Sequence, residues 1–158
     1  MTTNIPEKHL VTGLDPEIMI KKLTNLLNNA VKFTKQSITV TLSDETPEEG
    51  WFTITVSNDG RPIDKENVGK IFDPFFQEKK DELTSGFGIG LSLVRQLAEL
   101  HGGRIYISRN NDEGVSFTIE IPKSDITLSD DYASEMKNFE SGDTEKKTIV
   151  VADDESQI

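Results

Sequence analysis

The chain of 158 residues contains no cysteine, which excludes disulfide bonds and thiolate metal sites. Basic residues are few: 17 Lys and Arg stand against 28 Asp and Glu, for a net charge of -11 at pH 7. This balance argues against binding to nucleic acid or to an anionic membrane surface, both of which favour a basic face. No apolar run approaches the ~18 residues of a membrane span, and the N-terminus lacks the apolar core of a signal peptide. We therefore expect a soluble, acidic, cytoplasmic chain.

Two common nucleotide-binding signatures are also missing. The Walker loop requires Gly-Lys-Ser/Thr, and this triplet occurs nowhere in the chain. The dinucleotide fingerprint requires a buried strand directly before its glycines and an acidic residue about twenty positions after them. Here the polar segment 77–85 precedes the glycines, and Asn110 stands at the later position. A phosphate site in this chain would therefore be of another type.

Three alternate glycines, Gly86, Gly88 and Gly90, stand at the start of a predicted amphipathic helix. The apolar residues of this helix follow at helical spacing, and a glycine pair ends it: Leu91, Val94, Leu97 and Ala98, then Gly102 and Gly103. Unpaired backbone N–H groups and the helix dipole make such a start suitable for phosphate oxygens. Glycines also serve tight turns without a ligand, so the surrounding residues must decide.

Periodicity along the rest of the chain predicts three helices and four strands. Asp15 and Pro16 form a strong helix start, and apolar residues at helical spacing continue that helix to about Phe33. Alternating apolar residues predict two hairpins, with a short helix between them: strands at 38–42 and 52–56, the helix at 64–72, and strands at 104–108 and 115–121. The three helices most economically cover one face of the sheet.

Asn25, Asn29 and Lys32 fall on one stripe of the first predicted helix. An ordinary solvated face would more often carry Glu, Lys or Gln, because Asn is a poor residue in the middle of a helix. Two carboxamides in register with a lysine instead suggest oxygens directed at a hard cation and an ammonium group for phosphate.

Four segments together resemble the motifs of sensor histidine kinases, in the order of that family. Residues 25–33 resemble the N box, 58–63 a variant first glycine box, 71–77 the F box, and 86–91 the second glycine box. The resemblance covers about residues 15–122 and extends to the superfamily of gyrase, heat-shock chaperone and mismatch-repair ATPases. It implies an α+β fold of the Bergerat type, a two-layer α/β sandwich. Three helices would cover one face of a mixed, largely antiparallel sheet, with a flexible ATP lid.

The resemblance also implies that the domain binds ATP and Mg²⁺. By motif position, Asn29 would ligate Mg²⁺, Asn25 would support the metal and phosphate shell, and Lys32 would contact phosphate. These three are the candidate catalytic residues. The other candidate nucleotide-binding residues lie in the remaining motifs: Asn58, Gly60, Pro62, Ile63, Gln77, Gly86, Gly88, Gly90 and Leu91.

Two residues depart from the family pattern in the first glycine box. Asn58 stands where the family has its adenine-reading Asp, and Pro62 stands where it has the second glycine. Asn can still accept a hydrogen bond from the adenine amino group through its carbonyl, whereas Pro62 stiffens the loop and removes a donor. The alternative function is therefore a nucleotide-binding but catalytically silent interaction module.

The resemblance implies a protein histidine kinase domain that transfers the γ-phosphate of ATP to a histidine. Neither His9 nor His101 lies in the family's acceptor context, so we expect the acceptor on an adjacent helical dimerisation domain outside this chain. Residues 147–155 resemble the first strand and acidic pair of a response-regulator receiver, which implies a hybrid kinase of a two-component system. The family resemblance implies that the parent is a membrane-anchored bacterial sensor. We divide the chain as follows: 1–14, linker from the helical histidine domain; 15–122, ATP-binding domain; 123–147, acidic linker; 148–158, start of a receiver.

Overall fold

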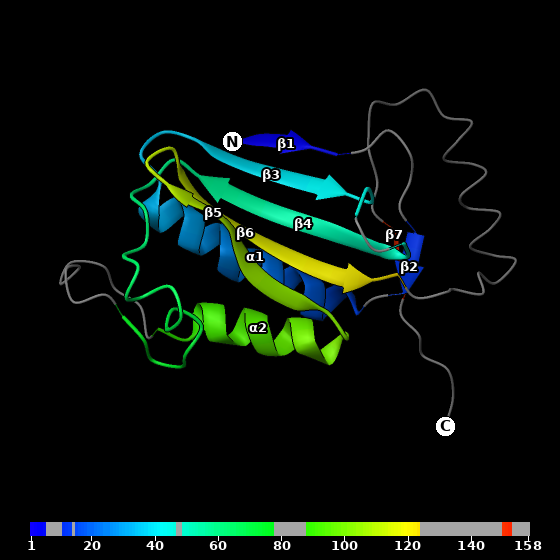
Figure 1. Cartoon of the computed structure of the whole chain (residues 1–158). Helices are drawn as coiled ribbons and strands as arrows, with labels where there is room; N and C mark the ends of the chain where they lie inside the picture. The colour runs from blue at the N-terminus through cyan, green and yellow to red at the C-terminus, as the bar shows by residue number, and fades with distance from the viewer. Residues whose placement is uncertain (6–10, 14, 47–48, 78–87, 124–149, 153–158) are drawn as a thin grey trace, which may run out of the picture.

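The computed structural model describes residues 1–5, 11–13, 15–46, 49–77, 88–123 and 150–152. Its main part has two layers, a five-stranded sheet and two helices that lie together on one face of it (Figure 1). The sheet order is β1-β3-β4-β6-β5, made of β1 (Thr2–Asn4), β3 (Ile38–Ser43), β4 (Trp51–Asn58), β6 (Gly114–Pro122) and β5 (Arg104–Asn111). β1 pairs parallel with β3, and the other neighbours pair antiparallel, which confirms the predicted mixed sheet. β1 is a fifth strand that the pattern did not predict.

Helix α1 (Pro16–Phe33) begins where the sequence predicts it. The Oδ1 atom of Asp15 accepts a hydrogen bond from the N–H of Ile18 at 3.0 Å and so caps the first turn. Pro16 follows in that turn, where its missing N–H costs nothing.

Helix α2 (Gly90–Leu100) corresponds to the predicted glycine helix. Gly102, just beyond its end, has a φ of +67°. A glycine adopts this left-handed conformation without strain, so it ends the helix as the sequence predicts.

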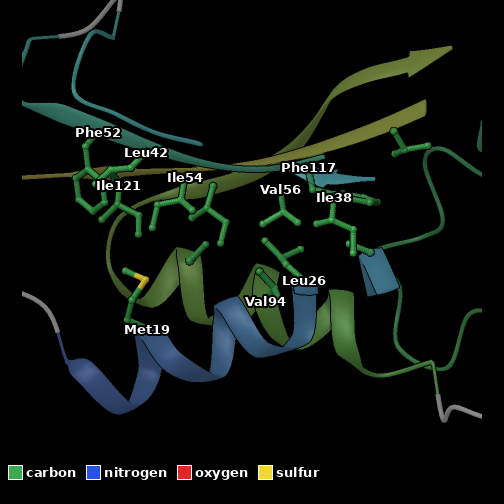
Figure 2. Close-up of a cluster of buried hydrophobic side chains, with 14 of the residues drawn as sticks. Met19, Leu26, Ile38, Leu42, Phe52, Ile54, Val56, Val94, Phe117 and Ile121 are labelled. Atoms are coloured by element: carbon green, nitrogen blue, oxygen red, sulfur yellow. The ribbon is translucent and has the colours of Figure 1, made fainter. Parts of the chain in front are cut away.

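The hydrophobic core lies between the two helices and the covered face of the sheet (Figure 2). Met19 and Leu26 of α1 and Val94 of α2 point toward the strands, and each is at most 7% exposed. The facing residues alternate along the strands, as expected for a sheet with one covered face: Leu42, Phe52, Ile54, Val56, Phe117, Ile119 and Ile121. The opposite face carries hydroxyl pairs such as Thr55 with Thr118, whose Oγ1 atoms are 2.9 Å apart.

The predicted short helix at 64–72 is wrong. The structure has a series of turns there, with backbone hydrogen bonds that span both three and four residues. Gly69 in the middle of the segment lowers its helix propensity, and Pro74 prevents a helix from continuing beyond it. Ile71 is nevertheless buried as expected. Two helices, rather than three, therefore cover the sheet within the described part of the chain.

A separate two-stranded sheet joins β2 (Val11–Gly13) to β7 (Val150–Ala152) in parallel. β7 lies where the sequence predicts a strand, but its pairing with residues that precede α1 was not predicted. The assignments of 1–14 and 148–158 to neighbouring domains stay predictions, and most of the predicted linker 123–147 lies outside the described residues. Of the helices that the structure describes, none has the length and apolar character needed to span a bilayer.

Candidate functional site

A cavity of about 590 Å³ opens between α1, the loop after β4, the turns that follow that loop, and the start of α2. Cavities of this size suit small molecules and cofactors. Ten of the twelve predicted site residues line it: Asn25, Asn29, Lys32, Asn58, Pro62, Ile63, Gln77, Gly88, Gly90 and Leu91. Gly60 does not line it, and Gly86 lies outside the described residues. The structure thus brings four separate sequence segments to one cavity.

Asn25 connects α1 to the start of α2. Its Nδ2 donates a hydrogen bond to the carbonyl of Lys21 at 2.8 Å, which leaves Oδ1 on the other side. A Cβ added to Gly90 would lie 3.2 Å from this Oδ1, so the carboxamide oxygen faces the first residue of α2. Asn29 and Lys32 follow on the same face of α1 and also line the cavity. This polar end therefore carries carboxamide oxygens and an ammonium group.

Among the residues that the structure describes, no side chain caps the start of α2. Ile89 occupies the N-cap position without a side-chain hydrogen bond, and the first turn contains no acidic residue. The hydroxyl of Ser92 donates to the carbonyl of Ile89 at 2.8 Å, so it does not cap the N–H groups either. The helix dipole and its first N–H groups are left for an anion in the cavity.

Gly88 holds the start of α2 against the segment that resembles the F box. Its φ is +66°, and a Cβ there would lie 2.6 Å from the carbonyl oxygen of Phe76. The N–H of Phe75 donates to the carbonyl of Gly88 at 2.9 Å. We predict core and lid-anchor roles for the three aromatic residues of this segment. Phe72 packs edge-on against Phe117, but Phe75 is 74% exposed and lies outside the core. The predicted flexible lid cannot be described, because residues 78–87 lie outside the described residues.

Asn58 ends β4, lines the cavity and is 3% exposed. Its Oδ1 accepts a hydrogen bond from the N–H of Gly60 at 2.9 Å. The carbonyl that we expect to accept from an adenine amino group is thus already engaged. A Cβ on Gly60 would lie 2.2 Å from the carbonyl oxygen of Phe33, so only glycine lets this loop lie against the end of α1.

Asp59 ties the same loop to the segment that follows α1. Its carboxylate accepts hydrogen bonds from four donors: the Thr34 hydroxyl at 2.7 Å and the backbone N–H groups of Lys35 at 2.8 Å, Gln36 at 3.0 Å and Ser37 at 3.1 Å. The Gln36 backbone N–H, followed by the Thr34 hydroxyl, holds the pKa of Asp59 well below its usual value. The acidic residue of this motif therefore anchors the backbone.

Asn110 is a site-supporting residue that the sequence did not reveal. Its Oδ1 accepts from the N–H of Ile63 at 2.7 Å, and its Nδ2 donates to the carbonyl of Ile63 at 2.9 Å. These reciprocal bonds join β5 to a cavity-lining residue far away in sequence, so no local pattern indicates them. Further lining residues were also not predicted: Asn28, Val31, Phe33, Arg61, Ile71, Phe76, Ile89, Val115 and Phe117.

Lys22 lies outside the cavity and is fully buried between α1 and the end of α2. Its Nζ is 3.2 Å from Nδ1 of His101, which is also 3.0 Å from the carbonyl oxygen of Leu97. Burial lowers the pKa of Lys22 to about 8, and the charge of Asp15 opposes this change. His101 is thus part of the packing between the helices.

Comparison with known proteins agrees with this fold. Residues 15–125 match the family described as histidine kinase-, DNA gyrase B- and HSP90-like ATPases. The chain belongs to this family, and the matched region is a histidine kinase ATP-binding catalytic domain.

The relatives are sensor kinases. The chain is 35% identical over 121 residues to the adaptive-response sensory kinase SasA of Synechococcus sp. (strain CC9902), a match that covers 76% of this chain and 32% of SasA. It is 30% identical over 122 residues to the sensor histidine kinase WalK of Bacillus subtilis (strain 168), covering 75% of this chain and 20% of WalK. The chain thus spans about a third or less of the length of these relatives.

Solved structures give the same family. The catalytic domain of the histidine kinase ThkA, in a nucleotide-free form, superposes with a TM-score of 0.63 at 34% identity, covering 78% of each chain. Full-length ShkA in complex with AMPPNP gives a TM-score of 0.60 at 25% identity, covering 80% of this chain and 27% of ShkA. These similarities confirm the predicted fold class and the predicted histidine kinase domain.

Proposed function

We propose that this domain transfers the γ-phosphate of ATP to a histidine on a helical dimerisation domain outside the chain. One observation carries the proposal: the carboxamides of Asn25 and Asn29 and the ammonium of Lys32 share a cavity with the uncapped start of α2. Such a set of groups suits a triphosphate. The apolar residues of the same cavity, among them Ile63 and Val115, suit the faces of a purine base.

The donor set also fits Mg²⁺. Within the described ranges no three His, Cys, Asp or Glu residues come together. The side-chain oxygens near Lys32 in the cavity are the carboxamides of Asn25 and Asn29. Carboxamide oxygens are hard ligands of the type that Mg²⁺ accepts. Asn29 is the proposed ligand, and Asn25 supports it. When bound, Mg²⁺ would offset the charge that develops on the phosphate oxygens.

The proposed reaction asks little covalent chemistry of this domain. A ring nitrogen of the accepting histidine bonds to the γ-phosphorus while the bond to the β–γ bridging oxygen breaks, and ADP leaves. Catalysis then consists mainly of positioning and charge neutralisation, to which Lys32 and the α2 N–H groups contribute. Gln77, Gly88, Gly90 and Leu91 are proposed phosphate-side contacts, and Asn58, Pro62 and Ile63 are proposed base-side contacts. A base for the histidine would come from its own domain.

The proposed partners are the helical phosphoacceptor domain and a receiver domain, either in the same protein or in a separate response regulator. The sensor-kinase relatives, which are much longer than this chain, support a multidomain parent. The resemblance of 147–155 to a receiver start supports a hybrid kinase. Pro62 favours the alternative of a catalytically silent module, because it lines the cavity but has no backbone N–H to donate to a nucleotide.

Calorimetric titration with ATP, with and without Mg²⁺, tests the metal site. We expect Mg²⁺ to tighten ATP binding, and Asn29→Ala to remove most of that dependence. Thr24→Ala, on the exposed side of α1, is the matched control and should keep it. Unchanged Mg²⁺ dependence in Asn29→Ala would refute the ligand assignment.

Labelled ATP tests the reaction. Added helical domain from the parent should acquire acid-labile phosphate, and this chain alone should not. Binding of ATP without any transfer to that domain would instead support the silent module.

A further inference from the structure

The carboxamide of Asn58 is oriented by a neighbour that can only donate. Its Oδ1 accepts from the backbone N–H of Gly60 at 2.9 Å, and the residue is 3% exposed. Because an N–H group requires an acceptor, the oxygen of the amide must occupy this position. The NH₂ group therefore occupies the other arm of the side chain.

The backbone N–H of Gly60, which is held in place by close packing, disfavours a rotated amide at Asn58. A Cβ on Gly60 would lie 2.2 Å from the carbonyl oxygen of Phe33, and a Cβ on Gly114 would lie 2.0 Å from the carbonyl oxygen of Asn58. The backbone is thus packed closely on both sides of the residue. Rotation would place the NH₂ group against the Gly60 N–H, so that two donors would face each other. Because both groups are buried, the lost hydrogen bond would be costly.

At an apolar part of the cavity, the NH₂ group is the arm of the Asn58 amide that is left to bind a ligand. It lines the cavity together with Ile63, Val115 and Phe117, and Val115 is its partner in the β4–β6 ladder. Among the described residues, the hydrogen bond to Gly60 is the one that its side chain makes. A purine whose faces lie on these apolar residues, with its phosphates toward Lys32, would meet a donor at Asn58.

We propose that Asn58 makes this site accept 6-oxopurine nucleotides as readily as ATP. This inference rests on the proposed nucleotide function. A donor at this point pairs with N1 of adenine or with the 6-oxo group of hypoxanthine and guanine. A carboxylate here could only accept, so it would favour the adenine amino group and repel a 6-oxo group. Because the amide removes that repulsion, ITP and GTP should bind within about three-fold of ATP.

Competition titrations with Mg·ATP and Mg·ITP test this inference. ITP differs from ATP only at position 6 and in the proton on N1, so the ratio of their Kd values isolates the contact. Asn58→Asp is nearly isosteric and keeps an acceptor for the Gly60 N–H. We expect a ratio within about three-fold for the natural chain and an ATP preference of about ten-fold or more in Asn58→Asp. A natural chain that already prefers ATP ten-fold, or the same ratio in both proteins, would overturn the inference.

Lys32→Met separates this inference from the proposed function. ATP and ITP carry the same triphosphate, so this variant should weaken both equally and leave their ratio unchanged. If the natural chain binds neither nucleotide, the proposed function itself fails. If it binds both but strongly prefers ATP, only the assignment of Asn58 fails.

Discussion

Asn110→Ala should loosen the loop that forms the proposed base end of the cavity. The substitution removes both hydrogen bonds between β5 and Ile63, at 2.7 and 2.9 Å. Since Ile63 lines the cavity, its backbone would lose the attachment that fixes it relative to the sheet. We expect losses of both stability and nucleotide affinity.

The size of the effect follows from the two bonds. Each hydrogen bond between neutral groups contributes about 1 kcal/mol, so the free energy of unfolding should fall by about 2 kcal/mol. For a chain of 158 residues, this corresponds to a decrease in Tm of about 4–8 °C.

Thermal and urea unfolding, followed by circular dichroism, measure this loss. Asn111→Ala is the matched control, because Asn111 is exposed and its Oδ1 accepts only from the nearby N–H of Glu113 at 3.1 Å. The control should change Tm by no more than about 2 °C. Equal Tm values for the two variants would refute the role assigned to Asn110.

Two further predictions concern pH. Because hydrogen bonds depress the folded-state pKa of Asp59, its contribution to stability is present above the usual Asp value of 3.8 and is lost as the pH falls below it. Asp59→Asn should therefore lower Tm at pH 7 by an amount that shrinks in acid, and a pH-independent difference would contradict this. Burial lowers the pKa of Lys22 from 10.5 to about 8. Between these pH values the unfolded state holds a proton that the folded state has lost, so the free energy of unfolding rises as the pH increases from about 8 to 10.5. Lys22→Met should be more stable than the natural chain at pH 7, with a gain that shrinks toward pH 10; a destabilised variant at pH 7 would refute the reasoning.

The elements that could be predicted from the sequence have local signals. Asp15 and Pro16 define the start of α1, and alternating residues define the strands from β3 to β6. β1 was missed because Thr2–Asn4 has no apolar alternation and exists as a strand only through its pairing with β3. The turns at 64–72 were read as a helix because Ile71 and its neighbours follow helical spacing over too short a distance to outweigh Gly69.

The candidate site divides in the same way. The stripe of Asn25, Asn29 and Lys32 could be predicted because helical spacing places these residues together and Asn is unfavourable in a helix. The role of Asn110 could not be predicted, because its hydrogen-bond partner Ile63 is distant in the sequence and comes close only in the folded domain. The roles of neighbouring Asn58 and Asp59 depend on contacts with Gly60 and with the backbone after α1, which no spacing reveals.

The order of the strands also determines when the domain can form during synthesis. β4 and β6 are neighbours in the sheet but lie far apart in the sequence (Figure 1). Asn58 pairs with Val115, and Trp51 pairs with Pro122. The β3–β4 hairpin can form early. The other edge of β4 stays unpaired until β6 has been synthesised, which happens after α2 and β5. Contacts so distant in sequence slow folding, because the chain must close a long loop before they form. Until β6 emerges, β4 has an open edge of unpaired backbone N–H and C=O groups, and the proposed base end of the cavity has no Val115 or Phe117.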